Sequence, residues 1–437
     1  MIYAYFIIIF IVGLYNSKNT DNNDYLYLSR KLTLPSFIAT IVTTWYGGIL
    51  EIGRFSYVNG IVTWIIFGFF YYISAIIFAL YIGPKLHKNN IYSIPEYFRV
   101  TYGEISQKIT SIILILVSSP APYLMILSTI LIHIFNIDFN IALIFGIIFS
   151  ISYIYLGGFR AIIKTDSIQF IFMYLGFCLM LFYLIYNFGG IEYLIDNTPS
   201  KNLTFTGNLP VGYILSWSLI AMVTFIDPNI FHRTYSSKDI HIIKKGFILS
   251  IFLWFIFDIL TISVGIYASA IIDSKILGNI NPYLFLADTY LPSILKNIFY
   301  IGLLSIVMST IDSFFFVSSM TIGNDLISSK KSLLNTKIGL IITGITSYII
   351  ASKFTFVIDV WYIFGSIAAS ALLIPFLLII FNKKRVLRFP VASLIIPIIV
   401  SVIWIYYDYP YQIDLMYPGI LSSLIICLFN KKISLQE

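Results

Sequence analysis

The sequence predicts an all-α polytopic membrane protein with about thirteen transmembrane helices, and three observations lead to this prediction. Of the 437 residues, 59% are hydrophobic and 11% are charged, whereas about a quarter of the residues of a typical soluble domain are charged. Apolar runs long enough to cross roughly 30 Å of hydrocarbon recur along the whole chain. Lysine and arginine concentrate in alternate loops between these runs.

The predicted helices follow the apolar runs between polar breaks. The first run, residues 3–15, lacks the basic flank and the clear cleavage site of a signal peptide, so we expect it to be a helix. The next runs predict helices over residues 33–58, 60–83, 106–135, 139–157, 165–188 and 211–229. The last runs predict helices over residues 243–272, 293–322, 335–352, 357–381, 389–406 and 415–430.

The basic residues predict the orientation of these helices. With the N-terminus outside, most of the 27 lysine and arginine residues fall in cytoplasmic loops, and Arg233 is counted among them. The opposite loops hold Lys201, Lys275, Lys296 and Lys353. We therefore expect an odd number of helices, with the C-terminus in the cytoplasm. The net charge of +7 is spread over loops as an orientation signal, and it does not indicate a nucleic-acid partner.

Two of the predicted helices are interrupted by residues that loosen or break a helix. Gly47-Gly48 interrupt the first, and Asp227-Pro228 interrupt the second. Paired interruptions of this kind are typical of transporters built from inverted repeats, although glycine and proline also serve packing and kinking in membrane helices. The single transmembrane domain, residues 1–437, then divides into a first helix and loop (1–32), repeat one (33–188), repeat two (211–381) and C-terminal helices (389–437).

Several polar side chains lie inside predicted helices. Ser309 and Thr310 form a hydroxyl pair that suits sodium, a hard cation that prefers oxygen ligands, or they bond back to carbonyls of their own helix. Glu51 and Arg54 are three residues apart and predict an intramembrane ion pair, with substrate contact as the alternative. Asp258 has no partner that the sequence reveals.

The glycine break marks the expected substrate region. Its backbone at Gly47 and Gly48 and the neighbouring Trp45 are candidate substrate contacts, because an aromatic face stacks on a ring or holds a cation; packing is the alternative for Trp45. The proline-rich stretch 118–123 predicts a kink that turns Tyr123 toward the centre, and a kink without any binding role is the alternative.

Two segments carry a family resemblance. Residues 157–169 read GGFRAIIKTDSIQ, and residues 308–313 read MSTIDS. Weaker matches follow the same order at residues 24–30, 94–103 and 227–233. Together these segments resemble the sodium/solute symporter family over roughly residues 24–330. The resemblance implies a LeuT-type fold with two inverted five-helix repeats, which moves a small solute together with sodium by alternating access.

The resemblance also assigns roles to residues of this chain. It implies that main-chain oxygens of Thr43, Tyr46 and Ile306 complete a sodium site with Ser309 and Thr310. It makes Asp166 and Gln169 part of an ion exit path, although Asp166 at the start of a helix would also serve as a cap. It aligns Ile220 and Thr224 with substrate-facing positions.

The substrate stays open at this point. The family's proline carriers have Asp at the position of Trp45 and Ser at that of Gly47, so this chain departs from them. The run 44–48 looks closer to the choline carriers, but Asn229 stands where those have a second aromatic residue. An amino acid, an organic cation, a carboxylate and a sugar all remain candidates.

Other function classes have weaker support. A channel should show a pore loop or rings of charge, and an intramembrane enzyme should show a catalytic set such as His-Glu-x-x-His; neither pattern is present in the sequence. A membrane sensor is a further alternative. Proton coupling is the nearest rival, because Asp166, Asp312 and Glu51 can each carry a proton. We therefore expect a non-enzymatic carrier in the cell membrane whose ligands are sodium and a small solute, with no obligate protein partner.

Overall fold

The computed structural model describes residues 1–15, 21–278, 280–328, 332–354, 357–381, 385–410, 413–429 and 431–433. The first helices are α1 (Ile2–Leu14), α2 (Asn22–Tyr27), α3 (Leu34–Trp45), α4 (Ile49–Asn59), α5 (Val62–Trp64), α6 (Phe70–Ile77), α7 (Gly83–Lys88), α8 (Ile94–Tyr102), α9 (Glu104–Val117), α10 (Ala121–Phe135) and α11 (Phe139–Phe188). The middle helices are α12 (Ile191–Asn197), α13 (Val211–Ala221), α14 (Pro228–Ser236), α15 (Ile240–Ile271), α16 (Ser274–Leu277) and α17 (Pro282–Tyr290). The last helices are α18 (Ser293–Met320), α19 (Leu333–Ala351), α20 (Val357–Ala368), α21 (Ile374–Phe381), α22 (Pro390–Tyr406) and α23 (Met416–Phe429).

Short elements connect or extend these helices. Tight 3-10 turns cover Leu28–Arg30, Ser200–Leu203 and Met222–Phe225. Wider π-helical segments also occur. Ile65–Phe69 joins α5 to α6, Phe78–Ile82 joins α6 to α7, and Ala369–Leu373 joins α20 to α21. Thr321–Ile327 extends α18. Two three-residue strands, β1 (Arg385–Leu387) and β2 (Lys431–Ile433), pair antiparallel.

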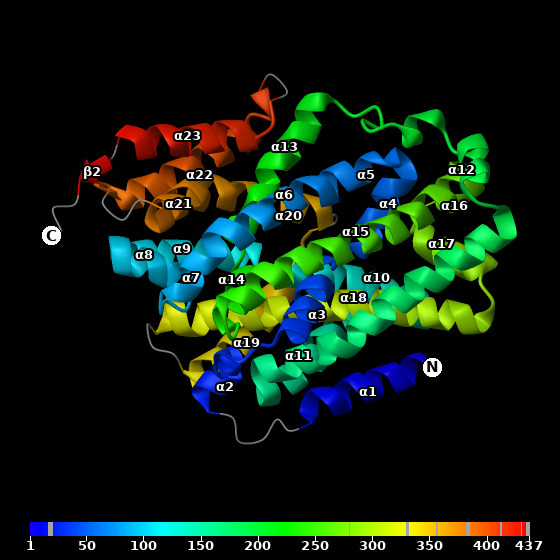
Figure 1. The fold of residues 1–437 in the computed structure, drawn as a ribbon, viewed down its shortest axis with the longest axis horizontal. Coiled ribbons are helices and arrows are strands. Elements are labelled where there is room, and N and C mark those ends of the chain that lie inside the picture. The colour runs from blue at the N-terminus through cyan, green and yellow to red at the C-terminus, as the bar shows by residue number, and fades with distance from the viewer. Residues whose placement is uncertain are drawn as a thin grey trace.

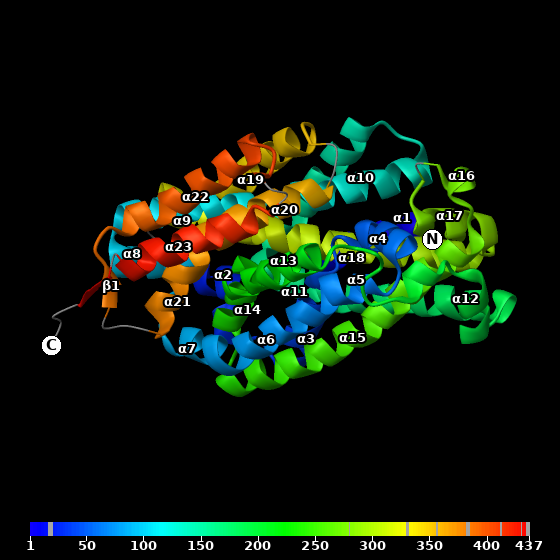
Figure 2. The same cartoon turned by 90° about the horizontal axis from the view of Figure 1, so that it is seen from above.

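The helices form one elongated bundle around α18 (Figures 1 and 2). The apolar window of Ser293–Ile327 is completely buried, and α18 packs against α3, α10, α11 and α19. Within the described residues, eight helical segments are long and apolar enough to cross a membrane, and α1, α3, α22 and α23 are shorter apolar helices. The all-α membrane architecture is confirmed, whereas the number thirteen stays a prediction.

Gly158 divides the longest helix. At 1.5 Å per residue, the 50 residues of α11 would extend about 75 Å, more than twice the hydrocarbon thickness. Gly158 has φ +56° and ψ −143°, and a Cβ there would lie 2.5 Å from the carbonyl oxygen of Tyr25, so only glycine fits. The predicted loop between residues 157 and 165 is wrong, because the helix resumes directly after Gly158. Asp166 therefore lies inside the helix and does not cap it.

Both predicted helix interruptions are confirmed. Residues 46–48 are not helical and separate α3 from α4. In the second interruption, the chain passes from α13 through a 3-10 turn to Asp227, whose Oδ1 caps α14 by accepting from the N–H groups of Asn229 and Ile230 at 2.7 and 2.9 Å. The helix after this break continues to Ser236, well beyond the predicted end at residue 229.

The first helix and the last described strand extend to opposite ends of the bundle. In Figures 1 and 2, α1 begins at one end of the molecule and the small sheet of β1 and β2 lies at the other. An odd number of crossings would produce this arrangement. The division into inverted repeats over residues 33–188 and 211–381 stays a prediction.

Candidate functional site

A cavity of about 210 Å³ lies between the two broken helices. Five of the predicted substrate contacts line it: Trp45, Gly48, Tyr123, Ile220 and Thr224. Gly47 is not among the lining residues. It instead packs against Thr310 and Tyr123, and a Cβ at Gly47 would lie 2.5 Å from each of these side chains.

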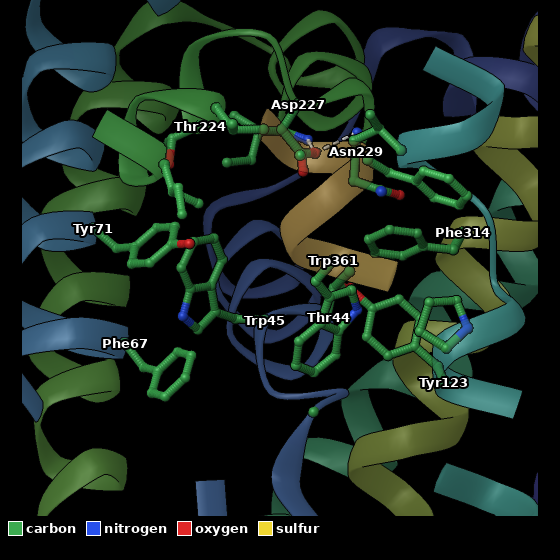
Figure 3. A pocket seen from close by; sticks show the side chains of 18 of the residues that line it. Thr44, Trp45, Phe67, Tyr71, Tyr123, Thr224, Asp227, Asn229, Phe314 and Trp361 are labelled. Atoms are coloured by element: carbon green, nitrogen blue, oxygen red, sulfur yellow. Dashed lines mark hydrogen bonds between the residues drawn. The ribbon is translucent and has the colours of Figure 1, made fainter. Parts of the chain in front are cut away.

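Aromatic rings form two facing walls of the cavity (Figure 3). On one side, the ring of Trp45 lies 5.0 Å from that of Tyr71 and 4.8 Å from that of Trp254. On the other side, Tyr123 lies 4.7 Å from Phe314 and 5.7 Å from Trp361. Each wall combines rings from three helices: α3, α6 and α15 on the first, and α10, α18 and α20 on the second. We call them the first and second aromatic walls.

The sequence identified one ring in each wall. Trp45 and Tyr123 stand next to a glycine pair and a proline kink, which are visible signals. Tyr71 and Trp254 lie in apolar runs, and Phe314 and Trp361 follow an aspartate by two residues. Nothing local separates these rings from packing residues. The indole of Trp361 lies so close to Gly48 that a Cβ there would overlap it, which explains why this position is glycine.

Three of the five residues of the predicted sodium site, Thr43, Ile306 and Thr310, are brought together. Thr310 of α18 donates its hydroxyl hydrogen toward the carbonyl oxygens of Thr44 at 3.1 Å and Thr43 at 3.5 Å, across the contact with α3. It also lies 3.1 Å from the carbonyl oxygen of Ile306, the back-bond that was the alternative for this residue. Because α3 stops at Trp45, its last carbonyls lack helical partners and are available as ligands.

Ser309, the second hydroxyl of the pair, faces a different partner. Its Oγ donates to Asp166 Oδ1 at 2.6 Å, and Thr40 donates to Asp166 Oδ2. Asp166 therefore joins α11 to α18 and α3 directly beside the predicted ion site. Gln169 points elsewhere, because its Nε2 lies 3.4 Å from the hydroxyl of Tyr5 on α1.

Arg233 is the cavity-lining residue that the sequence prediction misplaced. It was expected in a cytoplasmic loop, but it lies on α14 with only 1% of its surface exposed. Its Nη2 donates to Thr40, Thr44 and Ser313 at 2.8, 2.8 and 2.6 Å. The same nitrogen lies 3.8 Å from Asp166 Oδ2. The prediction placed Arg233 in a loop because it ended the helix at residue 229. Residues compatible with a helix continue to Ser236, and this signal would have placed Arg233 on the helix.

The predicted pair of Glu51 and Arg54 is not formed. No salt bridge joins these two described side chains, and Arg54 is exposed. An exposed guanidinium keeps its solvation and gains little from a neighbouring carboxylate. The prediction of an intramembrane ion pair is therefore wrong for this conformation.

Asp258 has partners that the sequence did not reveal. Its carboxylate accepts hydrogen bonds from the hydroxyls of Tyr46, at 2.9 Å, and Tyr72. The Tyr46 hydroxyl also lies 2.8 Å from the carbonyl oxygen of Trp254. Tyr46 is the first residue of the α3 break and supplies one predicted sodium ligand through its carbonyl. The cluster of Tyr46, Tyr72 and Asp258 therefore anchors the break to α6 and α15.

We expect Tyr46→Phe to destabilise the protein by about 1 to 3 kcal/mol, because it leaves a buried carboxylate with one donor fewer. The measurement is the melting temperature of the purified protein. Tyr57→Phe is the matched control, since the Tyr57 hydroxyl is half-buried and bonds to the neutral carbonyl of Ile272 at 3.2 Å. Equal losses in the two variants would contradict the anchoring role of Asp258.

The fold and the site together define a class. Broken helices that meet around a small cavity, inside a multi-span bundle, are the architecture of membrane transporters. The family model described as the Sodium:solute symporter family matches residues 27–390. This match covers most of the chain, and the protein belongs to that family.

Curated relatives and solved structures agree with this membership. The chain is 25% identical to the sodium/proline symporter of Haemophilus influenzae over 72% of its own length and 68% of the relative's. It is 27% identical to the sodium/pantothenate symporter of the same species, over 41% of its own length and only 38% of the relative's. A substrate-bound, outward-open Na⁺-coupled sialic acid symporter has a similar fold, with a TM-score of 0.79, 18% identity and coverage of 99% and 98%. A nucleobase-cation-symport-1 family transporter has a TM-score of 0.64, 12% identity and 95% coverage of both chains.

Proposed function

We propose that the protein is a secondary active transporter that couples the inward movement of sodium to that of a small organic solute by alternating access. One observation carries the proposal: the hydroxyl of Thr310 meets the free carbonyls at the end of α3, next to the cavity. The oxygens of Thr310 and Thr43 belong to the proposed sodium site, which Tyr46, Ile306 and Ser309 would complete.

Coupling follows from where these groups lie. A sodium ion held between α3 and α18 would tie the α3 break to the central helix. Trp45 and Gly48 belong to the same break and line the cavity, so fixing the break also fixes one side of the solute site. Sodium would therefore raise solute affinity, which is the thermodynamic requirement for symport. Asp166, bonded to Ser309, would receive the ion on its way to the cytoplasm.

The test needs no known solute. The melting temperature of the purified full chain is measured in sodium and in potassium at equal ionic strength, for the natural protein and for Ser309→Ala and Thr310→Ala. A specifically bound ion at a hundred times its Kd adds about 2.7 kcal/mol to the free energy of unfolding. We expect a sodium-specific rise that both substitutions abolish.

Ser128→Ala is the matched control. Ser128 is fully buried, and its hydroxyl bonds to the carbonyl oxygen of Leu124 in its own helix at 2.8 Å. This variant should keep the sodium response. Identical melting curves in sodium and potassium would instead direct attention to proton coupling, for which Asp166 and Asp312 are the buried carboxylates to examine.

The remaining assignments belong to the same proposal. The protein acts as a carrier and not as an enzyme, in the cell membrane, with its N-terminus outside and its C-terminus in the cytoplasm. The repeats are residues 33–188 and 211–381. The cytoplasmic loops remain rich in basic residues without Arg233, although Lys18, Lys330, Lys331, Lys383 and Lys384 lie outside the described residues.

A further inference from the structure

The charged groups of the cavity limit what it can bind. Of the described residues that line it, two carry charge: Asp227 and Arg233. A solute carboxylate would need a cation with free donors, and a solute ammonium would need a carboxylate with a free oxygen. The hydrogen bonds of Asp227 and Arg233 decide between these possibilities.

Four of the five N–H groups of Arg233 have acceptors within the protein. Its Nε donates to Thr40 at 3.0 Å, its Nη1 lies 3.4 Å from the carbonyl oxygen of Asn229, and its Nη2 is shared among three hydroxyls. Asp166, 3.8 Å away and fully buried, balances its charge. Most of the donor capacity of the guanidinium is thus used within the protein.

Asp227 has the opposite character. Both hydrogen bonds that it accepts from the described residues end on Oδ1, and it forms no salt bridge with any of them. Figure 3 shows its carboxylate directed toward the space between the two aromatic walls. Because Asp227 itself caps the amides of Asn229 and Ile230, the start of α14 offers no anion site either. The cavity therefore presents one carboxylate oxygen, Oδ2 of Asp227, to which no described residue donates a hydrogen bond.

The aromatic walls complete a site for positive charge. The faces of Trp, Tyr and Phe attract cations through their ring quadrupoles, most strongly where water is excluded. Ten aromatic residues line the cavity, six of them in the two walls. Figure 3 shows the rings of Trp45, Tyr71, Tyr123, Phe314 and Trp361 around the space below Asp227. A compact cation would contact aromatic rings on both sides and the carboxylate of Asp227.

Asn229 supplies neutral hydrogen-bonding groups. Its side chain is 3% exposed, lines the cavity, and finds no partner for its Oδ1 or its Nδ2 among the described residues. Thr224 also lines the cavity, and its hydroxyl has no hydrogen-bond partner among the described residues. Buried polar atoms are almost always bonded, so these groups point to a ligand that carries a hydroxyl or a similar group.

We propose that the transported solute is a small organic cation, with its charged group between the aromatic walls and Asp227 and a polar group at Asn229. This rests on the proposed transport function and adds the class of solute. The cavity volume of about 210 Å³ lies below the range of roughly 300 to 1,000 Å³ for sites of drug-sized ligands, which restricts the solute to a few heavy atoms.

The test uses a charged probe and its neutral isostere. Choline and 3,3-dimethyl-1-butanol have the same shape, but the second has carbon in place of nitrogen. Tryptophan fluorescence of the purified full chain in sodium reports binding, because Trp45, Trp254 and Trp361 line the cavity. We expect a saturable change with choline and at least tenfold weaker binding of the isostere.

Asp227→Asn tests the carboxylate without removing the helix cap, since asparagine caps as well as aspartate. Choline affinity should fall at least tenfold. Asp138→Asn is the matched control: Asp138 caps α11 by the same kind of bond, to the N–H of Asn140 at 2.8 Å, and lies outside the cavity. It should leave choline affinity unchanged.

Two results would overturn the inference: no saturable response to choline or tetramethylammonium, or equal affinity for choline and its isostere. The melting temperature in sodium and potassium, read on the same samples, separates this failure from failure of the proposed function. A sodium-specific rise without cation binding refutes only the solute class, whereas loss of both refutes the transport proposal as well.

Discussion

Gly47→Ala is expected to reduce the sodium-specific rise in melting temperature strongly. The added Cβ would lie 2.5 Å from Thr310 Cγ2 and from Tyr123 Cδ1, well inside contact distance. Thr310 would have to move away from the carbonyls of Thr43 and Thr44, with which it forms the proposed ion site. Overpacking of this kind costs about 1 to 3 kcal/mol, and we expect sodium affinity to fall at least tenfold.

Gly365→Ala provides the control for this prediction. Gly365 lines the same cavity, but a Cβ there would have no atom within 4 Å. The same methyl group is thus added without a clash, and sodium affinity should be retained. Sodium titrations followed by melting temperature compare the two variants. Unchanged sodium affinity in Gly47→Ala would place the ion site away from Thr310.

Arg233→Met is expected to lower the free energy of unfolding by about 3 to 5 kcal/mol, since it leaves the fully buried carboxylate of Asp166 without a cation. Adding Asp166→Asn should recover part of this loss, because the uncompensated charge disappears. The melting temperatures of the two single variants and the double variant give the coupling between the residues.

Arg160→Met is the control for charge removal at a surface. Arg160 pairs with Asp24 at 2.7 Å, but 38% of its side chain is exposed. Exposed pairs contribute about 0 to 1 kcal/mol, so a small change is expected. If Arg233→Met cost no more than Arg160→Met, or if Asp166→Asn deepened the loss, Arg233 would not be balancing Asp166.

Much of the architecture was predictable from local sequence. Apolar runs placed nearly every helix, and the residues that interrupt α3 and precede α14 are ones whose backbone preferences break helices wherever they occur. The helix boundary near Gly158 was harder. A single glycine turns the chain there without any polar loop, so hydropathy alone could not show that residues 159–164 are helical.

The candidate site divides in the same way. Ser309, Thr310 and Trp45 were found because they stand out from apolar neighbours or border a break. Arg233 was not found, because its local sequence does not distinguish a basic residue in a loop from one buried among hydroxyls. Its partners come from three other helices. The same holds for Asp258, whose tyrosine partners are distant in sequence.

The carboxylate of Asp227 also bears on the energetics of uptake. It stays with the protein, while a sodium ion and an organic cation would both cross the membrane. With one sodium ion per solute, each cycle would move two positive charges inward, and a membrane potential contributes about 2.3 kcal/mol per charge for every 100 mV. Such a carrier is electrogenic: voltage adds to the sodium gradient, and the solute accumulates inside even when the sodium gradient is shallow.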